Sequence, residues 1–227
     1  MEKRNKERLR KLIRWLLVDL AVACFILALL VHRPSQYKPV SPLPTDPNRK
    51  PVPHYFTHDL SPALYNGAQT RKPFELVVDE KLFNEAIAGL KWPQESQGVT
   101  FSAPVVLFTP DTITLMSMAN IEGAGFVITV VLAPRIDPNG LLNAEVEKVR
   151  IGAMNITFLA KLIAKKMYQD RLETVPVDTE TIGGKISAAL FNDEPVEPVF
   201  MVDDKKVRID KITITQGKLT ARIVPAS

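Results

Sequence analysis

A long apolar run near the start of the chain dominates its pattern of hydrophobic and polar positions. Residues 13–31 include two charged side chains, Arg14 and Asp19, among 19 residues. A helix of this length rises about 1.5 Å per residue and crosses the apolar core of a bilayer. A central Asp costs about 2.5–3.5 kcal/mol, which the many large apolar residues together more than offset. The pattern therefore predicts a transmembrane helix at 13–31, with anchor residues Ile13, Trp15, Leu16, Leu17, Phe25, Ile26, Leu27, Leu30 and Val31.

The residues before this run give the expected orientation. Residues 1–14 contain seven Lys or Arg and two Glu, a local charge of +5. Since basic residues beside a membrane helix stay cytoplasmic, we expect a cytoplasmic tail at 1–14, a helix in the inner (cytoplasmic) membrane, and 33–227 in the cell envelope. The whole chain carries +4, so the remainder carries −1 (4 minus 5). A body so close to neutrality is not expected to bind nucleic acid.

Two kinds of processing compete with an uncleaved signal-anchor. The apolar run ends in LLVHRP, which lacks the small residues that a signal peptidase needs. Residues 21–24, AVAC, faintly resemble a lipoprotein cleavage box but fall inside the apolar run. We therefore expect an uncleaved, single-pass anchor. Within it, Asp19 is either a tolerated charge or a polar contact with a partner helix.

A proline-rich segment follows the anchor. Nine of the 18 prolines fall within residues 34–73. Because proline fixes φ and lacks an N–H, this composition predicts a semi-extended stalk at 32–73, without regular helix or sheet, between the membrane and the domain. Local order stays open around residues 54–68. His54 and His58 are four residues apart and could share a metal on a helix, but the neighbouring prolines argue against a helix there. No metal site is predicted.

From Phe74 onward the spacing of apolar residues is that of a folded domain. Helical spacing predicts helices at 79–91 and 156–172, and a weaker helix at 178–192 contains two glycines. Alternating segments joined by short turns predict an antiparallel meander. The fold class is therefore α+β, a single domain at 74–227 with a curved antiparallel meander sheet packed by two or three helices. The predicted strands are 74–78, 99–108, 112–122, 125–134, 140–152, 198–203, 206–217 and 218–225.

Two strands carry more apolar side chains than one core face needs. In 125–134 both alternate faces are apolar, and on the preceding strand Met116 and Met118 lie opposite a conventional apolar face. Methionine suits an adaptable cavity, so we interpret the surplus as the wall of a ligand groove; the alternative is that these side chains pack beneath the helices. In 140–152 the alternation slips once, near Lys148. The candidate groove residues are Met116, Met118, Phe126, Ile128, Val130, Leu132, Leu159 and Ile163.

Residue types suited to catalysis are scarce in the predicted domain. The histidines are His32, His54 and His58, the cysteine is Cys24, and all four precede residue 74. The domain therefore lacks histidine general bases and thiol nucleophiles, and its sequence has no nucleophile-elbow, phosphate-loop or zinc-protease motif. Its acids follow the solvent positions of strands or occupy turns. We predict a protein that is not an enzyme and has no cofactor.

Several short motifs together resemble a known family. They are an L-F-N-E segment that contains Asn84, the turn PRIDPNG at 134–140, and a strand that ends V-R-I-G at Gly152 and leads into an apolar helix. Over residues 74–172 this order resembles the YpmS-like family of small bacterial membrane-anchored proteins, and more distantly the tubular lipid-binding (TULIP) group. The resemblance implies binding of a lipid or other hydrophobic ligand in the cell envelope, without a cofactor and without catalysis.

Two functions remain open from the sequence. In the first, an anchored extracytoplasmic domain binds a lipid or amphiphile between its sheet and its helices. In the second, the chain is a scaffold or interaction subunit of an envelope protein complex and its domain is solid inside. Asp19, the predicted stalk and the lack of catalytic motifs favour the second. A continuous apolar groove would favour the first.

Overall fold

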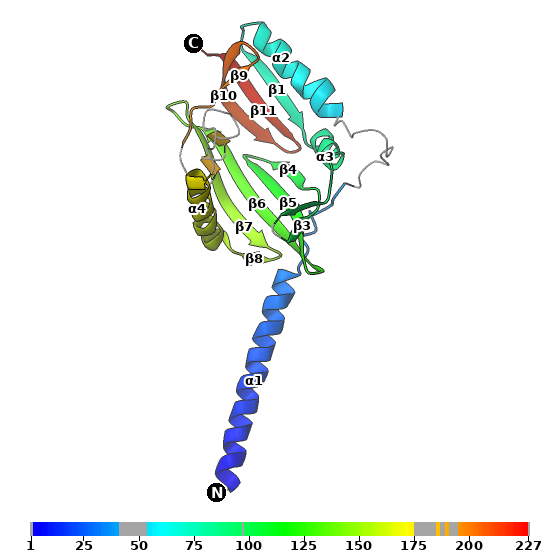
Figure 1. Ribbon diagram of the computed structural model, residues 1–227, viewed down its shortest axis with the longest axis vertical. Helices are drawn as coiled ribbons and strands as arrows, with labels where there is room; N and C mark the ends of the chain where they lie inside the picture. The colour runs from blue at the N-terminus through cyan, green and yellow to red at the C-terminus, as the bar shows by residue number, and fades with distance from the viewer. Residues whose placement is uncertain are drawn as a thin grey trace.

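The computed structural model describes residues 2–40, 54–96, 98–174, 185–186, 189–190 and 195–226. It confirms the α+β class: a long helix, α1 (Glu2–Leu30), projects from a domain built of antiparallel sheets and a few helices (Figure 1). The strands form two separate antiparallel sheets, where the sequence predicts one meander sheet. The reason is that the first and the last long strands of the domain pair with each other, far apart in sequence.

The apolar part of α1 is uncovered by the rest of the protein. The span Arg10–Val31 has 22 residues and none of it is buried, and every predicted anchor residue lies within it. Trp15 and Phe25 are 71% and 64% exposed. In the described part of the chain this is the one helix with the length and composition to cross a membrane. Such a helix is typical of a membrane anchor, although a secretion signal has the same composition.

The larger sheet has seven strands and forms the half of the domain nearer α1 (Figure 1). Its order is β2-β3-β5-β6-β7-β8, with β4 paired to β5 beyond the end of β3, and every pair is antiparallel. This confirms the predicted meander. The strands are β2 (Gln94–Ser96), β3 (Val99–Phe101), β4 (Val105–Thr109), β5 (Thr112–Ile121), β6 (Ala124–Ile136), β7 (Leu142–Ile151) and β8 (Met154–Asn155).

The slip predicted near Lys148 is a β-bulge in β7. Lys148 pairs with Val131 and the next pair is Val146 with Leu132, so Glu147 is the extra residue. A bulge places two residues of one strand opposite one residue of its neighbour. As a result Val146 and Val149, three residues apart, both stand beside β6 side chains of the same face.

The smaller sheet, farther from α1, has the order β1-β11-β10-β9. β1 pairs with β11 along its whole length, from Phe74 opposite Ile223 to Asp79 opposite Lys218. A backbone bridge between Val196 and Leu142 links the segment before β9 to the larger sheet. The strands are β1 (Phe74–Asp79), β9 (Val199–Val202), β10 (Lys205–Thr215) and β11 (Lys218–Pro225).

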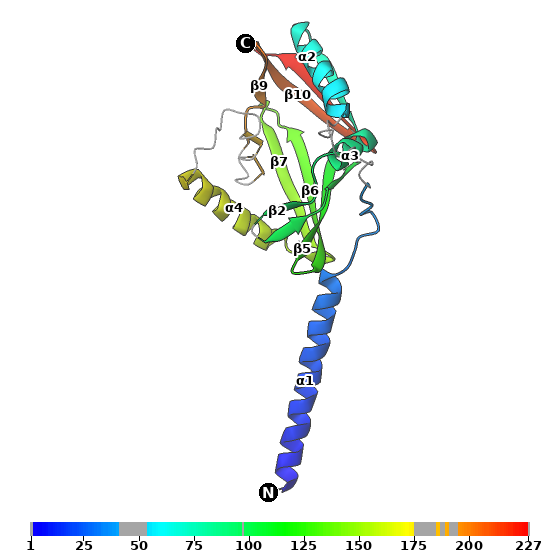
Figure 2. The same ribbon diagram turned by 45° about the vertical axis from the view of Figure 1, so that its right-hand side comes forward.

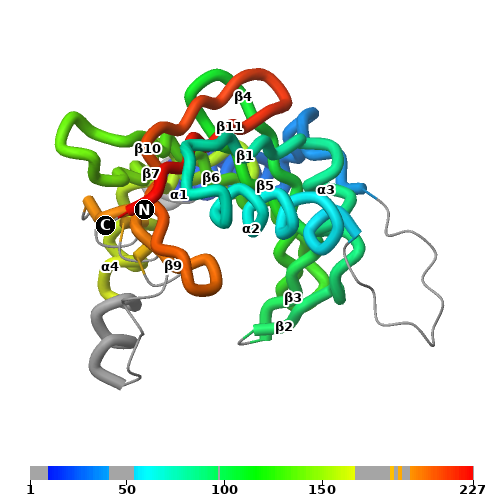
Figure 3. The backbone as a smooth tube through the Cα atoms, turned by 90° about the horizontal axis from the view of Figure 1, so that it is seen from above, coloured from blue at the N-terminus to red at the C-terminus, as the bar shows by residue number. Residues whose placement is uncertain are grey.

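Helices cover both sheets, and their apolar sides meet in two cores. α2 (Ser61–Gln69) lies on the smaller sheet, where Ala68 packs with the side chains of β10 and β11. α3 (Glu80–Ala88) begins at its N-cap, Asp79, whose carboxylate accepts hydrogen bonds from the backbone N–H groups of the first turn. Its Ile87 packs between the sheets with Phe108 and Ile214. Viewed from above, α3 and α4 (Thr157–Thr174) lie on opposite sides of the domain (Figure 3).

Two side chains of α3 close the outer edge of β4. The buried amide of Asn84 donates to the carbonyl oxygen of Val106 (2.6 Å) and accepts from the Val106 N–H (2.7 Å). Two residues along, the Glu80 carboxylate accepts from the Phe108 N–H (2.6 Å). These bonds replace those of a neighbouring strand, since buried backbone groups need a partner.

Part of the predicted stalk belongs to the domain, and the local order left open around 54–68 is a regular helix, which the proline content had argued against. Residues 54–69 are helical: a π-helix, η1 (Tyr55–Leu60), runs directly into α2. Pro62 stands in the first turn of α2, immediately after the wider π-helical turns, where a missing N–H is tolerated. The apolar face of this pair contributes Phe56 and Ala68 to the cores. Residues 41–53 of the predicted stalk lie outside the described residues.

The domain also touches the end of α1 directly, without a spacer. The N–H of Ala153, in the turn between β7 and β8, donates to the carbonyl oxygen of Leu29 (2.8 Å) and so caps the helix. Gly152 has φ +57°, and a Cβ there would overlap the carbonyl oxygens of Leu29 and Leu30. The segment after the helix then returns along the domain, where the Tyr37 hydroxyl lies 2.9 Å from that of Ser102.

The weaker helix predicted at 178–192 is described in part. Residues 185–186 and 189–190 are helical, and Ala189 is buried. The remainder of this prediction lies outside the described residues.

Candidate functional site

The face of the larger sheet that carries Leu115 and Val130 is covered in two halves. Over β4, the side chains of Val106 and Phe108 pack against α3 and the smaller sheet. Over β6 and β7, the covering element is α4, which slants away from the sheet toward its own C-terminal end (Figure 2). The half over β4 is part of the hydrophobic core, and the half over β6 and β7 leaves space between the sheet and α4.

The start of α4 is fixed to β7 by side-chain hydrogen bonds. The Asn155 carboxamide oxygen accepts from the backbone N–H of Thr157 (3.0 Å) and from its hydroxyl (2.6 Å). The same hydroxyl accepts from the Val149 N–H (2.9 Å), and the Ile156 N–H donates to the Val149 carbonyl oxygen (2.9 Å). An Asn or Thr that satisfies free N–H groups is a common way to start a helix. Only the first turn of α4 is therefore tied to the sheet by these bonds.

A groove of about 580 Å³ lies between α4 and the sheet. Cross-strand pairing builds its floor in two rows, since Val130 stands between Leu115 and Val149, and Leu132 stands beside Val146. The helix supplies the opposite wall. The lining residues are Leu115, Val130, Leu132, Val146 and Val149 from the sheet, Phe158, Ala160, Lys161, Leu162, Ala164 and Lys165 from α4, and Leu190.

The chemistry of this groove suits an apolar chain with a polar end. Its size falls within the range of about 300–1,000 Å³ that is usual for small-molecule sites. Ten of the twelve lining residues are apolar, and the two others, Lys161 and Lys165, lie on successive turns of α4. Lysine buries its aliphatic stem and keeps its ammonium group in water, so both can border the groove without filling it.

The two methionines predicted to line the groove lie on the other face of the sheet. Met116 is 1% exposed and packs with Val105 and Val127, and Tyr37 and Met118 pack against this cluster. In a strand, alternate side chains point to opposite faces, so Met116 and Leu115 are separated by the sheet itself. The prediction joined residues from two faces because strand 125–134 is apolar on both, and the structure shows that both faces are covered.

The other predicted groove residues divide between the lining and its surroundings. Val130 and Leu132 line the groove, whereas Phe126 and Ile128 precede them on β6 and are not part of the lining. On α4, Leu159 and Ile163 are not part of the lining, and their neighbours Phe158 and Leu162 line the open side of the groove, where all four side chains are about half exposed or more. The sequence shows the apolar stripe of this helix but not its rotation about its axis, which the bonds of Asn155 and Thr157 determine.

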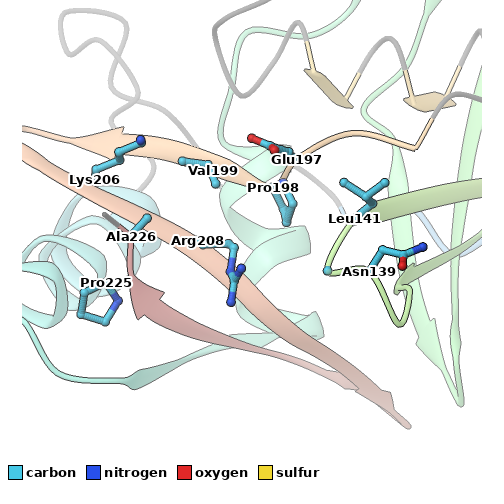
Figure 4. A pocket seen from close by; sticks show the side chains of 10 residues that line it. Asn139, Leu141, Glu197, Pro198, Val199, Lys206, Arg208, Pro225 and Ala226 are labelled. Carbon is cyan, nitrogen blue, oxygen red and sulfur yellow. The ribbon is translucent and has the colours of Figure 1, made fainter.

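A second cavity, of about 340 Å³, lies at the end of the domain away from α1. Figure 4 shows Lys206 and Arg208 of β10 on one side and Asn139 and Leu141 of the β6–β7 turn on the other. The Arg208 guanidinium is already paired, 3.7 Å from the carboxylate of Asp210. The walls of this second cavity are mostly polar, so the cavity has no apolar surface comparable to that of the groove.

The titratable side chains singled out in the sequence form no reactive cluster in the part of the chain that the structure describes. His54 and His58 stack with ring centroids 4.0 Å apart, and among described residues no group of three or more His, Cys, Asp or Glu could hold a metal ion. Asp203 and Asp204 form the turn between β9 and β10. There the hydrogen bond from Lys205 lowers the pKa of the exposed Asp204.

Comparison with known proteins adds no relative. No protein-family model matches the chain, and no curated protein or solved structure matches it either.

Proposed function

We propose that this protein is a membrane-anchored, extracytoplasmic carrier or sensor of a lipid or similar amphiphile, and that it holds the apolar chain of that ligand between α4 and the larger sheet. The observation that carries the proposal is the groove of about 580 Å³, which is apolar along its floor. An apolar surface of this kind gains about 25 cal/mol for each Å² removed from water. A hydrocarbon chain is the simplest ligand that removes it.

The polar end of the ligand would lie beside Lys161 and Lys165. Both follow Phe158 on α4, so an amphiphile with its tail on the sheet has cationic groups at the helix side of the groove. A carboxylate or phosphate headgroup matches them by charge. This proposal agrees with what the resemblance of the sequence motifs implies, namely a binding protein without catalysis.

The junction with α1 supports a retained anchor rather than a removed secretion signal. The Leu29 carbonyl oxygen accepts from the Ala153 N–H, and Gly152 leaves room for the helix end. A segment that is cut away has no need of a fitted site on the folded domain. The seven basic residues among 1–14 then direct the N-terminus to the cytoplasm and the domain to the other side.

The groove is tested by filling it from one position of α4. Ala164 lines the groove, and its neighbour Ile163 is 49% exposed and does not, so Ala164→Trp and Ile163→Trp form a matched pair. We expect the wild-type chain and Ile163→Trp to bind a dansyl-labelled fatty acid and to retain co-purified lipid in native mass spectrometry. Ala164→Trp should lose about tenfold or more in affinity, about 1.4 kcal/mol. A wild-type protein that is empty and binds no probe contradicts the proposal.

A second candidate, an interaction subunit of an envelope complex, rests on Asp19. This carboxylate lies on the uncovered surface of α1 within the candidate membrane span. Acids at such depth are costly unless they are paired with a partner. Crosslinking in intact membranes should then give a stoichiometric protein partner that Asp19→Leu abolishes and Asp19→Asn weakens. Unchanged crosslinking in both variants, or no partner at all, counts against this candidate.

A further inference from the structure

The position of α1 indicates where the membrane surface lies relative to the base of the domain, and this height is the membrane level. The span Arg10–Val31 has 22 residues and a helical length of about 33 Å, close to the roughly 30 Å of a bilayer's hydrocarbon core. Its last turn, at Leu29, is capped by Ala153. Because this cap is a direct backbone contact, the β7–β8 turn lies where the helix leaves the hydrocarbon core.

The start of α4 is close to that level. Phe158 follows Ala153 by five residues, a path of at most about 18 Å. Figures 1 and 2 both show the N-terminal end of α4 at the base of the domain, on the side where α1 joins it. The hairpin tip between β5 and β6 lies at the same base, and its Ile121 is 46% exposed.

The exposed side chains at this end of α4 are unusually apolar for a surface in water. Phe158 is 85% exposed, and Leu159, Leu162 and Ile163 are each about half exposed, at 51%, 59% and 49%. Soluble proteins rarely leave a contiguous apolar patch of this kind uncovered. Lysines at 165 and 166 follow on the next turn. Aromatic and aliphatic residues beside lysines are typical of helices that lie in a membrane interface.

We propose that the N-terminal half of α4 inserts into the surface of the bilayer that α1 spans, with Phe158 as the deepest residue, so that the groove opens onto the lipid. A bilayer is the occupant that this patch fits, since α1 already brings one to the base of the domain. The patch lies at the end of the domain at which α1 is fixed to it. This inference rests on the membrane anchoring of the proposed function and not on the occupation of the groove.

The test is a depth measurement on the full-length chain. In a Cys24→Ser background, Phe158→Cys is labelled with an environment-sensitive fluorophore, and the protein is reconstituted in vesicles that carry nitroxide quenchers at defined positions of the lipid chain. Met201→Cys is the matched control, because Met201 is 60% exposed and lies on β9 at the far end of the domain. Both positions are exposed, so neither substitution disturbs a core.

We expect the label at 158 to be quenched severalfold more strongly than the label at 201, most of all by shallow quenchers, and its emission to shift to the blue. Equal, weak quenching at the two positions overturns the inference. A blue-shifted label at 158 that lipid quenchers do not reach shows that this position is covered by protein rather than by lipid, and overturns it as well. The binding of dansyl fatty acid, measured on the Met201→Cys sample, whose label is outside the groove lining, reports the groove separately, so either idea can fail alone.

Discussion

Asn84 shows at the scale of one residue how a helix side chain can take the place of a strand. Its amide makes two hydrogen bonds to the backbone of Val106, a residue that is 2% exposed. A backbone group that loses its partner in such a place costs about 1–3 kcal/mol, because water does not replace it. The L-F-N-E motif therefore has a structural meaning in this chain: it closes the edge of β4.

We expect Asn84→Leu to lower the free energy of unfolding by about 2–4 kcal/mol, since the N–H and the carbonyl of Val106 both lose their partner. Chemical denaturation followed by circular dichroism measures this. Asn120→Ala is the control: Asn120 is exposed and accepts one bond from Gly123, so the loss should be about 1 kcal/mol or less. Equal losses in the two variants would show that the edge of β4 is satisfied in another way.

Gly152 permits the contact between the domain and α1. We expect Gly152→Ala to lower the free energy of unfolding by about 1–3 kcal/mol more than Gly123→Ala does. Both glycines have positive φ, at +57° and +87°, so both variants share the conformational penalty, but no atom lies within 4 Å of a Cβ at Gly123. Amide hydrogen exchange at Ala153, which donates to Leu29, should accelerate in the first variant alone. Unchanged exchange there would separate Gly152 from the anchor.

At the scale of elements, α4 is attached by its first turn and stands over a groove along the rest. We expect Thr157→Val to cost about 1 kcal/mol of stability and to speed hydrogen exchange in the first turn of α4, because Val149 loses its acceptor. Thr157→Ser keeps the hydroxyl and should behave as wild type. If both variants exchange alike, the helix is held by its apolar contacts instead.

The elements were largely predictable from the sequence, and their partners were not. Local alternation and turns locate β5, β6, β7 and the β10–β11 hairpin, and the slip near Lys148 marks a real bulge. The pairing of β1 with β11 depends on contacts across most of the domain, which no local pattern contains. The many prolines of the predicted stalk argued against a helix there. The helices η1 and α2 form nevertheless, because Pro62 lies in the first turn of α2, where proline is tolerated.

The candidate site was predictable in kind but only partly in its residues. A surplus of apolar side chains on β6 indicated a groove, and Val130 and Leu132 do line one. The prediction placed Met116 in the groove, but Met116 lies on the other face of the sheet, against which Tyr37 packs. Tyr37 comes from the segment predicted to be a stalk. The sequence contains no sign that residues beside the membrane helix would return to pack on the domain.

At the scale of the whole molecule, the smaller sheet joins the two ends of the domain. Removal of residues 218–227 should prevent folding, because β1 loses its neighbour and the core loses Ile223, which is 1% exposed. Removal of 226–227, which follow β11, should leave a cooperative unfolding transition. Expression and thermal melts of the two truncated chains check this. A truncated chain without β11 that still melts cooperatively would show that the larger sheet folds alone.

The pairing of β1 with β11 has a consequence for biosynthesis. Asp79 and Lys218 are partners across 139 residues of chain (218 minus 79), and closing a loop of that length costs about 4 kcal/mol of entropy beyond the constant term. During synthesis β1 and α2 leave the ribosome long before β11 has been made. Their apolar sides therefore stay uncovered until β11 is available to pair with β1. We expect the newly made chain to depend on a holding chaperone during that interval.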